Sequence, residues 1–369
     1  MSTVKVMLAG DVMTGRGIDQ ILPNPSEPAL YEAFVRSAVD YVQLAEEANG
    51  PIPRNVPFGY IWGDALPVLG REAPDLRIVN LETAVTTSDR PAPKGINYRM
   101  NPRNVGCIAA AGIDCCILAN NHVLDWGQDG LIQTLSVLQA AGIRVAGAGA
   151  DSEAAAAPAS LPLKQGTRVL VYAFACPSSG VPADWAARAD RPGVAFLDES
   201  TDAAVGEIAA RIGPDRAPRD LVVCSLHWGP NWGYEVSARH RAFAHALIER
   251  AGVDIVYGHS SHHPKAIEVH GGKPILYGCG DLLNDYEGIG NHEPYRDDLS
   301  LMYFASMDSE TRRLAEMRMV PFRIRRFRLN RASASETGWL RATMDRECRR
   351  FGRGVSVAPD GALMLSNAA

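Results

Sequence analysis

The sequence predicts an α/β fold in which helices cover largely parallel β-sheet. Short apolar runs that suit buried strands alternate along the chain with amphipathic stretches that suit helices. Five polar clusters follow such apolar runs directly. Because an α/β sheet collects the carboxyl ends of its parallel strands at one edge, where ligands bind, these clusters predict an active site at that edge.

The first strand is expected at Val4–Leu8. The segment from Ile21 to Tyr60 holds several prolines and aromatic residues, with an acidic helix expected over 31–48. Long connections with some order of their own are usually functional, so this insertion is expected to form a lid over the substrate.

Two strand–helix units follow the same pattern further along. The 3.6-residue spacing of apolar residues predicts helices over 130–141 and 238–252, each ended by a glycine. A new strand is expected directly after each helix, at 143–146 and at 253–257.

The last part of the chain predicts further strands and a closing helix. These are expected at 300–306, 317–320, 322–329 and 336–351. Since no repeat or linker separates the two regions, residues 1–310 are expected to form the catalytic domain. Residues 311–369 are expected to add C-terminal strands and a helix to that domain.

Composition indicates a globular protein with an ample core. The 369 residues are 46% hydrophobic and 21% charged, and the net charge of -5 argues against nucleic-acid or anionic-membrane partners. No apolar run approaches the roughly 20 residues of a membrane helix, and no signal segment is expected before the first strand. Seven scattered cysteines without a CxxC pair suit reduced thiols, so a cytoplasmic location is expected.

Carboxylates and histidines supply the chemistry of the polar clusters. Asp11 follows the first strand and Glu82 ends an apolar run, where a carboxylate is either a metal ligand or a cap or salt-bridge partner. Arg16 either pairs with Asp11 or binds an anionic group of the substrate. His227 follows another apolar run, and the loop Gly258–His263 places three histidines within five residues, the spacing of a metal loop.

Together these residues form a mixed nitrogen and oxygen donor set, which suits a divalent transition metal such as Mn, Zn, Fe, Co or Ni. The five clusters stand in this order along the chain: Gly10-Asp11, Asn80-Leu81-Glu82, Asn120-Asn121-His122, His227-Trp228-Gly229 and Gly258–His263.

This order resembles the CapA-like (poly-γ-glutamate capsule biosynthesis) family of the calcineurin-like metallophosphoesterase superfamily. The resemblance covers the chain from Lys5 to about Phe351. It implies a four-layer α/β/β/α sandwich with a centre of one or two metal ions at the strand ends. The implied metal ligands are Glu82, Asn121, His227, His259 and His262.

Two positions depart from the metallophosphoesterase pattern. Met13 stands where that superfamily has a histidine ligand, and Glu82 stands where it has a bridging aspartate. The loss of one imidazole frees Asp11 for a role other than metal binding.

A narrower resemblance, to the lasso-peptide epimerases, depends on His292. It implies an isomerase that inverts a Cα centre of a ribosomally made precursor peptide. Asp11 and His292 would act as acid and base on the two faces of that carbon, because one group alone tends to return the proton to the same side. The expected partner is the precursor peptide, alone or presented by a separate leader-binding protein.

The alternative is a hydrolase, either a metal-dependent phosphoesterase or another CapA-like enzyme of poly-γ-glutamate metabolism. His122 would then protonate the leaving oxygen and Arg16 would hold the phosphoryl group, with Asn120 and Trp228 as further substrate-binding residues. A third hypothesis is a binding module that keeps the fold without catalysis. The ligand-like donor set argues against it.

Overall fold

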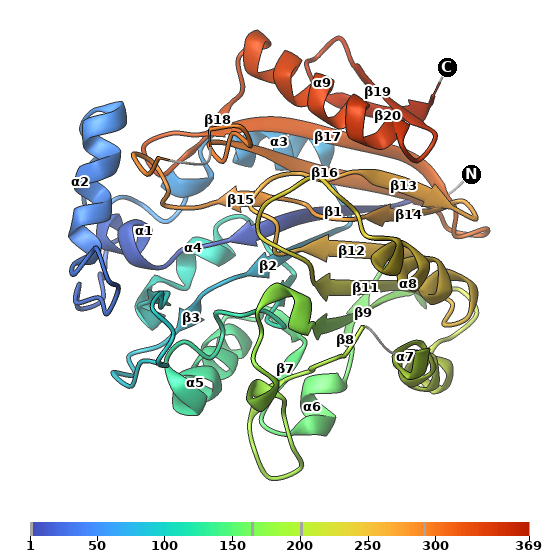
Figure 1. Cartoon of the computed structure of the whole chain (residues 1–369), viewed down its shortest axis with the longest axis horizontal. Coiled ribbons are helices and arrows are strands. Elements are labelled where there is room, and N and C mark those ends of the chain that lie inside the picture. The colour runs from blue at the N-terminus through green and yellow to red at the C-terminus, as the bar shows by residue number, and fades with distance from the viewer. Residues whose placement is uncertain (1–2, 164–165, 200–201, 291–292, 369) are drawn as a thin grey trace.

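The computed structural model describes residues 3–163, 166–199, 202–290 and 293–368. Two β-sheets pack face to face at its centre (Figure 1). The first sheet has the strand order β19 (Arg353–Val357), β20 (Leu363–Asn367), β17 (Leu314–Ile324), β16 (Leu299–Asp308), β1 (Thr3–Val12), β2 (Leu76–Leu81), β5 (Cys115–Ile117) and β6 (Arg144–Ala146). The second sheet has the order β13 (Ile267–His270), β14 (Lys273–Leu276), β12 (Ile255–His259), β11 (Leu221–His227), β9 (Arg168–Ala175) and β8 (Ala159–Pro162).

The remaining strands are short and pair either with these sheets or with each other. They are β15 (Asp281–Leu283) on β1, β18 (Leu329–Arg331) on β17, β3 (Ala84–Val85) with β4 (Arg99–Met100), and β7 (Ala148–Gly149) with β10 (Gly193–Val194). The helices are α1 (Arg16–Ile21), α2 (Ala38–Asn49), α3 (Ala65–Glu72), α4 (Gly106–Ala109), α5 (Gly127–Ala140), α6 (Ser152–Ala156), α7 (Asp202–Asp215), α8 (Ala238–Glu249) and α9 (Ala334–Arg349).

The parallel part of each sheet positions the site. β1, β2, β5 and β6 run parallel in the first sheet, and β9, β11, β12 and β14 run parallel in the second. The five polar clusters lie at the carboxyl ends of β1, β2, β5, β11 and β12. The expectation that they gather at one edge of an α/β fold is therefore confirmed.

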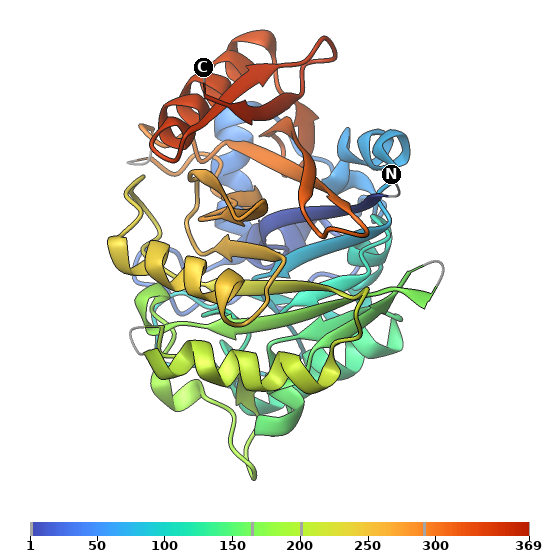
Figure 2. The same cartoon turned by 90° about the vertical axis from the view of Figure 1, so that its right-hand side faces the viewer.

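Side chains alternate between two apolar cores, as the period-2 geometry of strands requires. In β9, Val169 and Val171 face the first sheet, whereas Leu170 and Tyr172 pack with residues of α7 and α8. Figure 2 shows both helices lying along the same outer face of the second sheet. Residues of α3, α4 and α5 pack in the core of the first sheet. The predicted four-layer α/β/β/α sandwich is confirmed.

The C-terminal strands extend the first sheet rather than standing apart from it. β17 pairs with β16 along its length, and α9 covers β19 and β17. The single strand expected over 322–329 is wrong. β17 continues to Ile324, and the chain then turns at Arg326 and Phe327, both with positive φ, before the short β18.

The segment after β1 is anchored by one buried arginine. Arg16 Nη2 lies 2.5 Å from Asp285 Oδ1, and its Nη1 lies 3.0 Å from Glu32 Oε1. Nη1 also donates to the Tyr41 hydroxyl of α2 at 3.0 Å. The helix predicted over 31–48 begins only at Ala38, because Ser37 caps it and accepts from the Val39 amide. Within the described residues, no helix is long and apolar enough to cross a membrane.

Replacing Arg16 by Met should lower the free energy of unfolding by about 3–5 kcal/mol, because two buried carboxylates would lose their counter-charge. Chemical denaturation of both proteins measures the difference. The control is Arg90→Met, which breaks an exposed ion pair with Asp129 and should change stability by less than about 1 kcal/mol. Equal effects of the two substitutions would contradict the anchoring role.

Candidate metal centre

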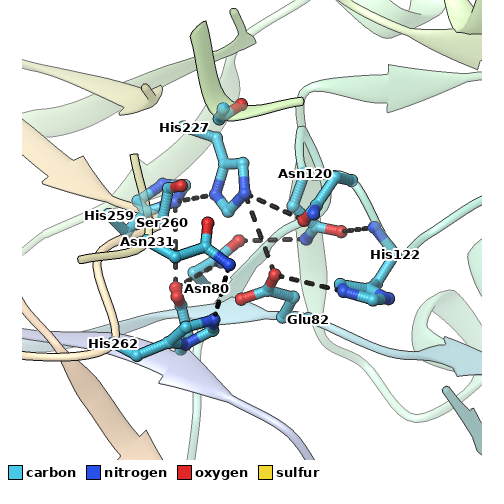
Figure 3. Close-up of polar contacts among 12 residues, drawn as sticks. Asn80, Glu82, Asn120, His122, His227, Asn231, His259, Ser260 and His262 are labelled. Carbon is cyan, nitrogen blue, oxygen red and sulfur yellow. Dashed lines mark hydrogen bonds and ion pairs between the residues drawn. The ribbon is translucent and has the colours of Figure 1, made fainter. Parts of the chain in front are cut away.

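Buried acidic and imidazole side chains from both sheets meet where the parallel strands end. Figure 3 shows Glu82, His227, His259 and His262 directed toward one another. Asp11 comes from β1, and Asp281 lies beside it because β15 pairs in parallel with β1 at that register. All six side chains are buried.

Asp11 belongs to two possible donor sets. One consists of Asp11, His227 and His259, and the other of Asp11, His262 and Asp281; within each, one potential ligand atom per residue lies within 4.8 Å of the others. His227 Nδ1 and His259 Nδ1 are 2.7 Å apart, and His262 Nδ1 is 2.8 Å from Asp281 Oδ1. Asp11 is thus the carboxylate that the two sets share.

Glu82 and Asn121 complete the side of the centre nearest His227. Glu82 Oε1 lies 3.8 Å from His227 Nε2 and also 3.8 Å from His122 Nε2. Asn121 Oδ1 lies 3.0 Å from His227 Nε2. The structure therefore brings together all five predicted metal ligands with Asp11.

The donor set fits a divalent transition metal. Asp11 Oδ2 and Glu82 Oε2 are buried and have no hydrogen-bond partner among the described atoms, although buried carboxylate oxygens almost always have one. The two carboxylates share the space with imidazole nitrogens, which are donors for such metals. A cation would satisfy both unpaired oxygens and neutralise the buried negative charge.

Burial and neighbouring negative charges shift the pKa values of the two carboxylates Asp11 and Glu82. Burial, and then the neighbouring Asp281, raise the pKa of Asp11 to about 6. Burial and Asp11 raise the pKa of Glu82 well above its usual value. These carboxylates are therefore hard to ionise together without a cation.

The histidines are shifted in different directions. Burial lowers the pKa of His259 to about 3 and that of His227 well below its usual value, so both are neutral, the form that binds metals. Burial alone would lower the pKa of His262 too, but the carboxylates of Asp281 and Asp11 raise it.

Further polar residues fix the donors in place. Asn80 Nδ2 donates to Asp11 Oδ1 at 2.7 Å, and Ser225 Oγ lies 2.6 Å from His259 Nε2. Asn284 Nδ2 donates to Asp281 Oδ2 at 2.7 Å. Such outer contacts orient ligands and are part of most metal sites.

His122 is held beside the centre by a carboxylate and a lysine. Its Nδ1 lies 2.6 Å from Asp125 Oδ2. Lys94 Nζ lies 2.8 Å from Asp125 Oδ1 and 3.3 Å from His122 Nδ1, and it donates to the Asn121 carbonyl. With Nδ1 occupied, Nε2 is the ring atom that faces Glu82.

Three predicted substrate-binding residues make polar contacts within the protein. The guanidinium of Arg16 is buried against Asp285 and Glu32. The Asn120 Nδ2 group donates to Asn80 Oδ1 and to the Leu81 carbonyl. Its Oδ1 accepts from the backbone amides of His122 and Val123, which begin the following turn. Trp228 is a core residue that donates to the Tyr277 carbonyl. Contacts within the protein therefore occupy the polar groups of all three side chains, and their substrate-binding roles stay predictions.

His292 lies outside the described residues, so its predicted catalytic role stays a prediction. Sequence reasoning missed Asp281, Asp125, Lys94 and Asn231. Asp281 carried a signal, since it ends the cluster Tyr277–Asp281 after a strand. Asn231 Nδ2 lies 3.1 Å from His262 Nε2, but its position in a loop after β11 gave no pattern.

The metal-free protein should lose stability as the pH rises from about 4 to about 6. The pKa of Asp11 is higher in the folded chain, about 6, than its ordinary 3.8, so the fold favours the protonated form and ionisation opposes folding. The loss should reach about 3 kcal/mol, and Asp11→Asn should remove it. Denaturation of chelator-treated protein across this pH range measures both. An unchanged pH dependence in the variant would contradict the assignment to Asp11.

Comparison with known proteins shows which family the chain belongs to. The family model for the bacterial capsule synthesis protein PGA_cap matches residues 5–286. A probable polyglutamine synthesis accessory protein of Mycobacterium tuberculosis is 48% identical over 368 residues, covering 99% of this chain and 97% of the relative. The PGA biosynthesis protein CapA of Bacillus subtilis is 28% identical over 208 residues, covering 56% of this chain and 52% of the relative.

Among solved structures, a phosphatase from Mycoplasma pneumoniae aligns over 88% of this chain and 94% of its own, with 10% identity and a TM-score of 0.45. A likeness this distant adds nothing on function. The sequence relatives and the family match confirm the predicted CapA-like membership, whereas nothing among them supports the narrower epimerase assignment. The chain belongs to the family of bacterial capsule synthesis proteins of the PGA_cap type.

Proposed function

We propose that the chain is a metal-dependent hydrolase that cleaves an amide or ester bond in the metabolism of a glutamate or glutamine polymer. The observation that carries this proposal is the buried donor set of Asp11, Glu82 and three histidines beside His122. The polymer comes from the printed names of the relatives, a polyglutamine synthesis accessory protein and a PGA biosynthesis protein.

Two groups of ligands would hold the metal. Glu82, Asn121, His227 and His259 lie on one side of Asp11, and His262 and Asp281 lie on the other. A divalent Mn, Zn, Fe, Co or Ni ion bound there would act as a Lewis acid on the bond to be cleaved. Asp281 would then supply a ligand in a chain that has Met13 where a histidine is expected.

His122 would move the proton that cleavage requires. Asp125 binds Nδ1 and so fixes the ring, and burial lowers the pKa of His122 to about 4, so the ring is neutral. Its Nε2 would take a proton from the attacking water and pass it to the departing oxygen or nitrogen. Lys94 contacts the Asp125 carboxylate and the Asn121 carbonyl. It would therefore fix the position of His122, the proposed proton donor, relative to Asn121, a proposed metal ligand.

Aromatic side chains border the His262 side of the centre and would contact the substrate. The ring centroid of Trp232 lies 5.4 Å from that of His262, and Tyr295 lies 5.3 Å from Trp232. Tyr234 lies 5.5 Å from Tyr295. All three rings are partly exposed, so they can pack against the methylene groups of a polymer backbone.

The direct test is to load purified protein with each metal and supply poly-γ-glutamate, poly-α-glutamate, γ-glutamyl-glutamine and a simple phosphomonoester. Release of shorter chains or free amino acid, measured by mass spectrometry and lost on chelation, would support the proposal. Turnover of the phosphomonoester alone would replace the polymer hydrolase by a phosphoesterase.

One observation favours a second function, the peptide epimerase. Asp11 Oδ2 is buried without a partner, so it is available as a base. Ile289, Tyr286 and Asn284 line a cavity of about 210 Å³ just before His292 in the chain. Incubation with a precursor peptide in D2O would place deuterium at one inverted Cα. Retained configuration with no deuterium uptake would exclude this reaction for that peptide.

Replacing Asp281 by Asn should reduce the bound metal by one ion while leaving His227 and His259 able to hold the other. The substitution removes a negative charge from the set that includes His262, so the affinity for that ion should fall about 10–100-fold. Elemental analysis after dialysis measures the stoichiometry. Full retention of both ions would show that Asp281 is not a ligand.

Replacing Asp125 by Asn should lower kcat about 100-fold, because His122 would lose the partner that orients its ring. Lys94→Met should have a smaller effect in the same direction. Metal content should stay at the wild-type level in both proteins, which distinguishes lost proton transfer from lost metal. Wild-type kcat in Asp125→Asn would argue against His122 as the proton donor.

A further inference from the structure

A second cluster of metal-binding side chains lies on the outer side of the second sheet. Helix α8 contributes His245 and Glu249, and strand β13 contributes Glu268 and His270. Residues four apart on a helix share one face, as do residues two apart on a strand, so the two pairs face each other across the α8–β13 contact. None of these residues belongs to the centre at the strand ends.

The donor atoms are already close together. His245 Nε2 lies 3.0 Å from Glu268 Oε1, and His270 Nε2 lies 2.7 Å from Glu249 Oε1. The two imidazole rings are stacked, with centroids 3.7 Å apart and planes 10° apart. One donor atom each from His245, Glu268 and His270 lies within 4.8 Å of the others.

These separations approach what a four-coordinate ion requires. Ligand distances of about 2.0–2.2 Å around a tetrahedral Zn(II) place neighbouring donors about 3.3 Å apart. His245, Glu268 and His270 already lie close together, and a rotation of the exposed Glu249 side chain would supply the fourth donor. The three donors His245, His270 and Glu249 are partly exposed, so an ion can reach them from solvent.

Glu268 is the fixed ligand of the cluster. It is buried, and its Oε2 accepts from the Tyr277 hydroxyl at 2.7 Å. Arg241 Nη2 donates to Oε1 at 3.1 Å. The local charge is two carboxylates against one guanidinium, so a divalent cation is electrostatically favourable there, and the half-exposed Arg241 can turn toward solvent.

We propose that His245, Glu249, Glu268 and His270 form a peripheral site for a divalent transition metal, with Zn(II) as the best match to a two-histidine, two-carboxylate set. The ion ties the end of α8 to the edge strand β13. This site is independent of the proposed hydrolase activity.

The test separates the two metal sites by substitution. In a protein whose main centre is disabled by His227→Ala and His262→Ala, which removes one imidazole from each of its two donor sets, Co(II) is titrated after chelation. We expect one ion to bind with the intense visible absorption of four-coordinate Co(II), and Zn(II) to raise Tm. Adding His245→Gln and His270→Gln should abolish both signals, whereas Glu249→Gln should weaken binding about 10-fold. The matched control, Arg239→Gln, changes an exposed residue of the same helix and should have no effect.

Circular dichroism establishes that each variant is folded before titration. If the doubly disabled background does not fold, elemental analysis of otherwise unaltered protein takes its place, and the His245→Gln/His270→Gln protein should then hold one ion fewer. The proposal is overturned if the His245→Gln/His270→Gln substitutions change neither the stoichiometry nor the Co(II) spectrum. Binding seen only at millimolar Zn(II) would overturn it as well.

Discussion

The mutual repulsion of Asp11, Glu82 and Asp281 is the constraint on which the rest of the site depends. These carboxylates are buried at the ends of adjacent strands, where water cannot screen their charge. The fold holds Asp11 through the Asn80 amide, and it holds Asp281 through His262 and Asn284. Such burial would be unfavourable for a structural residue, and here it would favour the binding of a small, highly charged ion.

The fold and most of the donor set could be predicted from the sequence. Buried parallel strands appear in the sequence as continuous apolar runs. Where such a run ends in a polar cluster, the polar side chains lie at the edge of the sheet where ligands bind. That reasoning located Glu82, Asn121, His227, His259 and His262 together. It depended on strand direction alone, so it did not require the order of the strands in either sheet.

Residues whose roles arise from tertiary contacts could not be predicted. Arg16 resembled an anion binder, but its partners, Asp285 and Glu32, lie in segments that only the folded chain brings to it. Trp228 follows His227, a candidate metal ligand, yet alternation along the chain turns it to the opposite side, into the core beneath α8. Lys94 lies in an irregular loop, so no periodic pattern in the sequence indicates its contact with Asp125.

The pairing of β1 with β16 has a consequence for how the chain is made. Thr3 is paired with Asp308, so β1 gains this neighbour only after some 300 further residues have been synthesised. Asp281, on β15, also arrives late and joins β1 from the other end of the chain. Contacts this distant in sequence slow folding, and the nascent chain exposes the edge of β1 meanwhile. The metal centre therefore forms among the last features of the protein, and a truncated product would lack it.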